Sequence, residues 1–133
     1  MGNLSLKSLF TDVEKGLFLK VIMDISKKGP AGIPVKSQFV ANVSDMLFGN
    51  EPSLSEDAAI GFHININVAR KLISVWSESK KGILKCIIID FLNNDKILED
   101  EFKSAKDFFD EVGIVDPKFN NIASLIIPDP WTM

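Results

Sequence analysis

Apolar residues recur at three- and four-residue steps along most of the chain, and this spacing predicts helices. The first begins at Thr11, which forms a capping box with Glu14, and it stops at Gly29-Pro30. A second begins at Pro34, and Gly49 is expected to cap its end. The apolar faces of these two helices are Val13, Leu17, Val21, Ile22 and Ile25, then Val35, Phe39, Val40, Val43, Met46 and Leu47.

The next segment, after a second capping box at Ser53 and Glu56, carries two patterns. From Phe62 to Val68, apolar and polar residues alternate as they do in a half-buried strand. A helical stripe runs through the same residues and continues past them, at Phe62, Ile66, Ala69, Ile73 and Trp76. Because the helical pattern is the longer one, we predict a single long helix here.

The second half of the chain predicts three more helices. A break at Ser79-Lys80-Lys81-Gly82 precedes a deeply buried fourth helix, and Asn93 to Lys96 form the turn after it. A fifth helix is expected to end at Gly113. Asp116-Pro117 then starts a short sixth helix, and the tail from Pro128 to Trp131 is predicted to be extended or irregular.

The two halves of the chain look related. The segments Ile33–Gly49 and Ile97–Gly113 have the same spacing, and LFLKVIMD from Leu17 parallels ILKCIIID from Ile83. Two related helix–turn–helix pairs would bury their apolar faces against each other, and chance similarity between amphipathic helices is the alternative. We therefore predict an all-α, single-domain bundle of about six helices, with these two pairs, a long connecting helix and a short C-terminal helix.

Composition agrees with one folded domain over residues 1–133, with flexible ends at about 1–10 and 128–133. Hydrophobic residues make up 46% of the chain, which excludes disorder as the default. A net charge of −3 argues against nucleic-acid binding through phosphates. Neither a membrane-spanning segment nor a signal peptide is evident, so we expect a cytoplasmic protein without integral membrane association.

A short motif in the second half, DFLNNDKILEDEF from Asp90, resembles the turn A-D-G-x-I-x-x-x-E of the tellurite-resistance TerB-like helical family. Asn94-Asp95-Lys96-Ile97 occupies the D-G-x-I positions and Glu101 the final acid, although the first acid and the glycine are replaced. In the first half, Ser37 stands where the final acid belongs. The resemblance extends in outline from Asp12 to Ile114. It implies an all-helical bundle associated with stress responses and with metal ions.

The same segment resembles an EF-hand calcium loop when Asp90 is counted as its first position. Asn94 and Glu101 then fall at ligand positions, but Leu92 offers no oxygen and Asp95 replaces the glycine of the sharp turn. The candidate ligands of a weak divalent-cation site, with Ca²⁺ as the ion, are therefore Asp90, Asn94, Asp95 and Glu101. Alternatively, the acids at the start of the fifth helix only favour its dipole.

No catalytic signature is legible, so we expect no enzymatic activity. Cys86 lies on an apolar helix and is expected to be buried as a small hydrophobic residue. His63 has no partner at metal-ligand spacing. Asp24 and Asp90 occupy matching positions in the repeat, where they either form an acid pair or bond to the turns that follow them.

The candidate partner-binding residues are Asp107, Asp110 and Glu111 on the acidic fifth helix, and Trp131 in the tail. Trp131 either packs back onto the bundle or anchors a partner. The leading hypothesis is a non-enzymatic TerB-like domain that binds a protein partner as an interaction or stress-response module. The alternative is a small acidic inhibitor or immunity-type protein that binds a basic enzyme.

Overall fold

The computed structural model describes residues 6–49, 55–116 and 119, and over these residues the chain is helical. Its helices are α1 (Leu6–Leu9), α2 (Asp12–Ile25), the 3₁₀ turn η1 (Pro30–Gly32), α3 (Ser37–Phe48), α4 (Glu56–His63), α5 (Ile66–Ser74), α6 (Glu78–Asn93) and α7 (Glu99–Val112). Within these ranges, β-type pairing is limited to an isolated bridge between Lys28 and Pro34. The prediction of an all-α bundle is confirmed.

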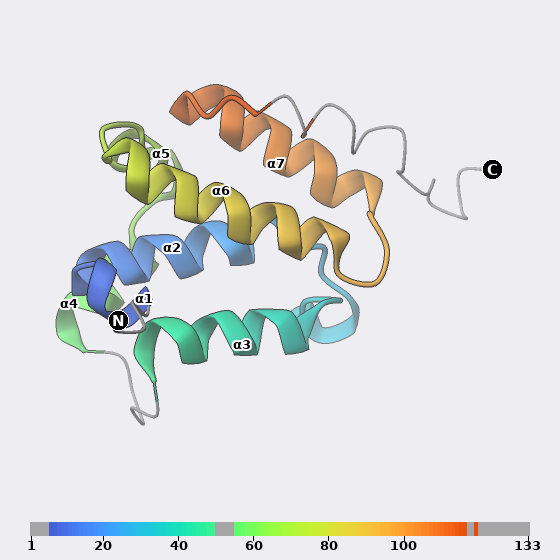
Figure 1. The fold of residues 1–133 in the computed structure, drawn as a ribbon. Helices are drawn as coiled ribbons and strands as arrows, with labels where there is room; N and C mark the ends of the chain where they lie inside the picture. Colours follow the sequence, from blue (N-terminus) through green and yellow to red (C-terminus); the bar gives the residue numbers. More distant parts are fainter. Residues whose placement is uncertain (1–5, 50–54, 117–118, 120–133) are drawn as a thin grey trace, which may run out of the picture.

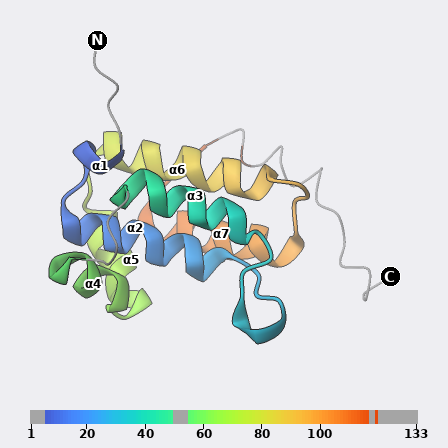
Figure 2. The same ribbon diagram turned by 90° about the horizontal axis from the view of Figure 1, so that it is seen from below.

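The bundle is built from two helical hairpins. α2 and α6 form a middle layer, which α3 covers on one side and α7 on the other (Figures 1 and 2). The α2–α3 turn and the α6–α7 turn lie at the same end of the bundle, and α1 and α4 lie toward the opposite end (Figure 1). The arrangement therefore brings together two turns that are far apart in the sequence.

The two hairpins share backbone conformations at equivalent positions of the predicted repeat. Ala31 and Asp95 both adopt the left-handed region, with φ angles of 60° and 63°. Gly49 and Gly113, which end α3 and α7, both have positive φ angles but differ in conformation, with ψ angles of −142° and 32°. A left-handed conformation is unfavourable for a residue with a Cβ. Its recurrence in the same register supports two related hairpins more strongly than shared amphipathicity does.

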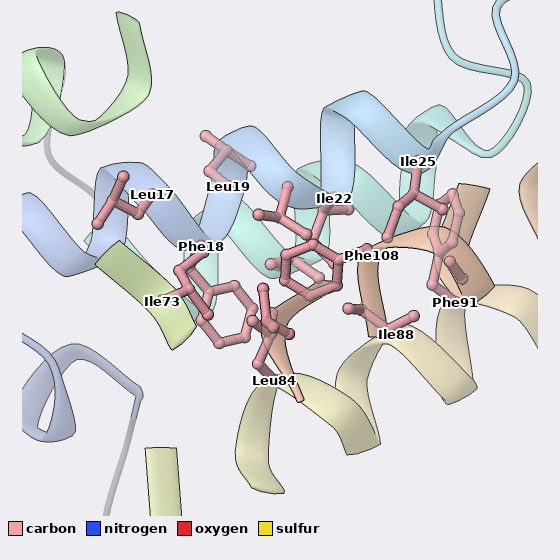
Figure 3. Packing of buried hydrophobic residues seen from close by; sticks show 14 of the residues in the cluster. Leu17, Phe18, Leu19, Ile22, Ile25, Ile73, Leu84, Ile88, Phe91 and Phe108 are labelled. Carbon is pink, nitrogen blue, oxygen red and sulfur yellow. The ribbon is translucent and has the colours of Figure 1, made fainter. Parts of the chain in front are cut away.

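The core forms where the two hairpins meet. The ring of Phe108 from α7 lies among Ile22 of α2 and Leu84 and Ile88 of α6, and all four side chains are fully buried (Figure 3). Burying one side chain of this size contributes roughly 1.5–3 kcal/mol. The predicted deep burial of the fourth helix is confirmed on this face of α6.

α2 and α4 cross at two glycines. A Cβ atom added to Gly16 would lie 2.1 Å from the carbonyl oxygen of Ala58, and one added to Gly61 would lie 2.2 Å from the carbonyl oxygen of Val13. These distances are far inside van der Waals contact. Only glycine at both positions lets the two backbones approach this closely.

The predicted long helix is interrupted. α4 ends at His63 and α5 begins at Ile66, because the side chain of Asn65 accepts a hydrogen bond of 2.8 Å from the Asn67 N–H and caps a new helix. The choice of helix over strand for residues 62–68 is nevertheless confirmed. The break also turns the chain, so that α5 can pack against α2 and α7 while α4 packs against α2.

α6 begins earlier than the sequence suggested. The hydroxyl of Ser77 accepts a hydrogen bond of 3.2 Å from the Lys80 N–H and caps a helix that starts at Glu78. The stretch Ser79-Lys80-Lys81-Gly82, predicted as a break, is therefore the first turn and a half of α6. In contrast, the capping box of Thr11 and Glu14 is confirmed with both hydrogen bonds present.

The ends of the chain also differ from the prediction. α1 and the buried ring of Phe10 lie within the segment expected to be a flexible end. The N-cap of α4 is Ser55, whereas the predicted cap, Ser53, lies outside the described residues. The sixth helix, except for Phe119, and the tail from residue 128 lie outside them as well.

Candidate functional site

The two hairpin turns meet around a buried carboxylate. Glu101, in the first turn of α7, is 0% exposed. Its Oε1 lies 2.8 Å from the amine of Lys36, whose side chain is 4% exposed. Its Oε2 accepts a hydrogen bond of 3.0 Å from the backbone N–H of Lys27. One carboxylate thus binds both ends of the segment 27–36, which we call the hairpin loop.

Lys36 makes two hydrogen bonds in addition to its ion pair with Glu101. Besides Glu101, its amine donates to the carbonyl oxygens of Phe91 and Leu92, each 3.0 Å away in the last turn of α6. It also lies 5.1 Å from the centroid of the Phe91 ring. A buried ion pair is tolerated only when its remaining hydrogen-bonding capacity is satisfied. Lys36 meets this condition, whereas Oε1 of Glu101 is buried with the ion pair but without a hydrogen bond among the described residues. The pair joins the N-cap of α3 to α6 and α7.

The hairpin loop projects from the end of the bundle with a defined backbone (Figure 2). The Val35 N–H donates to the carbonyl oxygen of Lys27 at 2.8 Å and closes the loop at its base. At its tip, Ala31 adopts the left-handed conformation, which costs a non-glycine residue roughly 1–2 kcal/mol. Ile33 and Val35 are 57% and 54% exposed. A constrained loop therefore holds two apolar side chains in solvent.

A groove of about 300 Å³ separates the hairpin loop from the α6–α7 turn. It is lined by Val35, Lys36, Ser37, Gln38, Asn94, Asp95, Lys96 and Leu98. Val35 and Leu98 supply apolar walls, one from each turn. The exposed amine of Lys96 makes no hydrogen bond or ion pair with any residue that the structure describes. We call the hairpin loop and this groove together the turn face.

The four predicted metal ligands do not form a ligand set. Both oxygens of Glu101 face cationic or N–H donors of the hairpin loop. Asn94 and Asp95 line the groove, and Asp90 is exposed on α6 beside a different hollow. Over residues 6–49, 55–116 and 119, no three His, Cys, Asp or Glu side chains are grouped so that they could hold a metal ion. The carboxylate that would complete a calcium loop is committed to Lys36 instead.

The acidic surface predicted for partner binding is largely neutralised by the chain itself. Asp110 pairs with a lysine of α7 at 3.1 Å, and Glu111 pairs with an arginine of α5 at 2.5 Å. Asp107 is exposed, with no such partner in the described part of the chain. Trp131 lies outside the described residues. The helix therefore offers less unpaired negative charge than its composition suggests.

The remaining candidate residues are dispersed. Asp24 lies 3.6 Å from Arg70, and no interaction among the described residues joins it to Asp90. The predicted burial of Cys86 is wrong, because its side of α6 faces solvent. His63 is exposed at the end of α4, where its ring packs edge-on against Phe62. No acid pair and no thiol–imidazole pair forms among these side chains.

No family model, curated protein or solved structure matches the chain. The TerB-like resemblance therefore stays a prediction, which depends on the turn motif and on the two hairpins. Among the residues placed by the structure, no helix has the length and apolar character needed to cross a bilayer.

Reasoning from the sequence missed the loop residues that complete this site. Lys36 directly precedes Ser37, which stands at the position equivalent to Glu101 in the second half of the repeat. A basic residue beside this missing acid could have indicated an ion pair between the two hairpins. Ile33 and Val35 flank Pro34 in a segment read only as a connection and a helix start. Apolar residues on both sides of a proline in a loop were the signal for an exposed apolar tip.

Proposed function

We propose that the chain is a non-enzymatic protein-interaction domain and that the turn face is its docking surface. The hairpin loop is the observation that carries this proposal. A left-handed alanine and a buried ion pair are unfavourable features, and backbone strain of this kind concentrates at functional sites. Here they hold Ile33 and Val35 away from the core, where these side chains contribute little to folding.

The chemistry of the turn face defines the partner segment. Val35 and Leu98 suit an apolar side chain. The amine of Lys96 at the rim, which has no ion-pair partner in the described part of the chain, suits a carboxylate. A buried apolar anchor with a polar rim is the usual organisation of a protein interface. The groove holds one large side chain rather than a folded domain, so the partner presents a short segment with an apolar residue next to an acidic one.

The acidic-inhibitor alternative has weaker support. It requires the carboxylates of α7 to be available to a basic enzyme. Glu99, Asp100, Glu101, Asp110 and Glu111 each pair with a cation of this chain. The stress-response association implied by the TerB-like resemblance remains a prediction.

Partner capture with matched surface variants tests the proposal. Wild-type protein, an Ile33→Ser/Val35→Ser double variant and a Val75→Ser control are compared for binding to proteins from cells that express the chain. Val75, the C-cap of α5, is 81% exposed, so its variant removes an even more accessible apolar side chain elsewhere on the surface. We expect a partner that the control retains and the double variant loses by at least about tenfold, equivalent to about 1.4 kcal/mol. Equal retention by all three proteins would contradict the proposal.

A further inference from the structure

We propose that the turn groove is a carboxylate-binding site, and that it is the unfilled counterpart of the position that Glu101 occupies in the second hairpin. The acid that it receives is a side chain of the docking segment, and this part rests on the proposed function. The preference of the groove for a carboxylate stands without a partner, because it follows from the internal repeat and from the charge of Lys96.

In the second hairpin, the acid of the repeat reaches across to the turn of the first. Glu101 lies in the first turn of α7. Its carboxylate accepts the Lys27 N–H, just beyond the end of α2, at 3.0 Å and pairs with the Lys36 amine at 2.8 Å. The side chain is fully buried. A carboxylate therefore occupies the space between the start of α7 and the α2–α3 turn.

The first hairpin has a serine at the equivalent position. Ser37 is separated from Glu101 by the same number of residues that separates the left-handed residues Ala31 and Asp95. It likewise lies in the first turn of its helix, α3. Ser37 is exposed, and its hydroxyl makes no hydrogen bond with a residue in the described part of the chain. A serine side chain is too short to reach across as the glutamate does, so the equivalent space stays open.

The turn groove lies in that open space. It extends from Ser37 at the start of α3 to Asn94, Asp95 and Lys96 in the turn after α6. These elements are equivalent to the two that Glu101 joins, which are the start of the second helix of one hairpin and the turn of the other hairpin. The groove volume of about 300 Å³ is many times the roughly 10–15 Å³ that one water molecule needs. A side chain with a carboxylate can therefore enter it.

The groove supplies the donors that a carboxylate needs. The Lys96 amine lines it without an ion-pair partner among the residues that the structure describes. The hydroxyl of Ser37 and the side-chain amide of Asn94 line it as well, and both groups can donate to a carboxylate. Asp95 adds a negative charge to the same rim and weakens the attraction of a free anion. The site therefore favours an acid that the apolar contacts of the same segment hold beside Lys96.

A carboxylate introduced into the chain tests the site without a partner. Ser37→Glu places the acid of the repeat at its equivalent position, and we expect the equilibrium constant for unfolding to fall by about threefold or more. Ser37→Gln has the same shape without the charge and should give no such gain. Lys96→Met should remove the gain of Ser37→Glu, whereas a general effect of negative charge at the start of α3 would remain. Denaturant unfolding of these variants and of the double variant measures the effect.

Binding of a short probe tests the occupant. The dipeptides acetyl-Leu-Glu-amide and acetyl-Leu-Gln-amide differ only in the charge of one side chain. In NMR titrations of the full chain, we expect the acidic probe to shift the amide signals of Ser37 and Lys96 and to bind at least about fivefold more tightly than the neutral probe. Lys96→Met should remove this difference because the cation is lost. Ser37→Glu should remove it because its own carboxylate fills the groove.

Either of two results would overturn the inference. One is no gain in stability from Ser37→Glu over Ser37→Gln, or a gain that Lys96→Met leaves intact. The other is equal shifts with the two probes, including none with either. Partner capture is read separately: a partner that Lys96→Met retains at the wild-type level would remove this inference alone, and a carboxylate site without a captured partner would remove only the proposed function.

Discussion

The carboxylate of Glu101 and the amine of Lys36 depend on each other, because removing either leaves an unpaired charge in the interior. Glu101→Gln and Lys36→Met should each lower the free energy of unfolding by about 3–5 kcal/mol. Replacing both, with Lys36→Met and Glu101→Leu, should lower it by much less than the sum of the single effects, since no lone charge remains. Denaturant unfolding of the four proteins measures this coupling, and additive effects would contradict the ion pair.

Glu14 predicts part of the acid sensitivity of the fold. Burial raises the pKa of its carboxyl, but hydrogen bonds from the Lys80 amine and the Thr11 backbone outweigh this and hold the pKa below its ordinary value of 4.5. A pKa lowered by folding means that the unfolded chain binds the proton more tightly. The stabilisation is therefore present above pH 4.5 and is lost as the pH falls through the lower folded-state pKa.

The variant Glu14→Gln should show a shallower loss of stability between pH 5 and pH 3 than the wild type does. Thermal unfolding across this range measures the difference. Glu56→Gln, at an exposed acid in the first turn of α4, is the matched control. Equal slopes for Glu14→Gln and the wild type would show that the Lys80 and Thr11 contacts do not depend on the charge.

At the scale of the helices, the crossing of α2 and α4 depends on the absence of two Cβ atoms. Gly16→Ala and Gly61→Ala should each destabilise the protein by about 3 kcal/mol or more, because the added carbon meets backbone atoms that cannot move independently. Gly82→Ala in α6 meets no atom within 4 Å and should instead stabilise by roughly 0.5–1 kcal/mol. Circular dichroism melts separate the two classes, and a neutral Gly16→Ala would refute the close crossing.

Helices were predictable from the sequence where one apolar stripe and one strong end signal coincide. The capping box at Thr11 and the glycine at position 113 located the start of α2 and the end of α7 in this way. Where several polar residues can cap, the sequence leaves the boundary open. Asn65 interrupts a continuous helical stripe, and Ser77 rather than the later polar residues starts α6. Those choices depend on how α4, α5 and α6 pack, which periodicity does not encode.

At the scale of the whole molecule, the turn motif located the end of the bundle where the two hairpins meet, but it did not indicate the ion pair that forms there. Asn94, Asp95 and Glu101 do lie at the place where the two hairpins meet. The partner that determines the role of Glu101 is Lys36, which is distant in the sequence and reaches it only when the hairpins pack. Local spacing alone made the acid a candidate metal ligand, whereas tertiary structure makes it one half of an ion pair.

We infer that Glu101 fixes both ends of the hairpin loop and so makes the turn face a preformed surface. Amide hydrogen exchange on the full chain, resolved by NMR, tests it most directly at the backbone N–H of Lys27, which has the Glu101 carboxylate as its acceptor. We expect this amide to be protected in the wild type. In Glu101→Gln it should exchange faster, while amides inside α2 keep their relative protection. Exchange of the Lys27 amide at the rate of an unstructured chain in the wild-type protein would show that Glu101 does not hold this end of the hairpin loop.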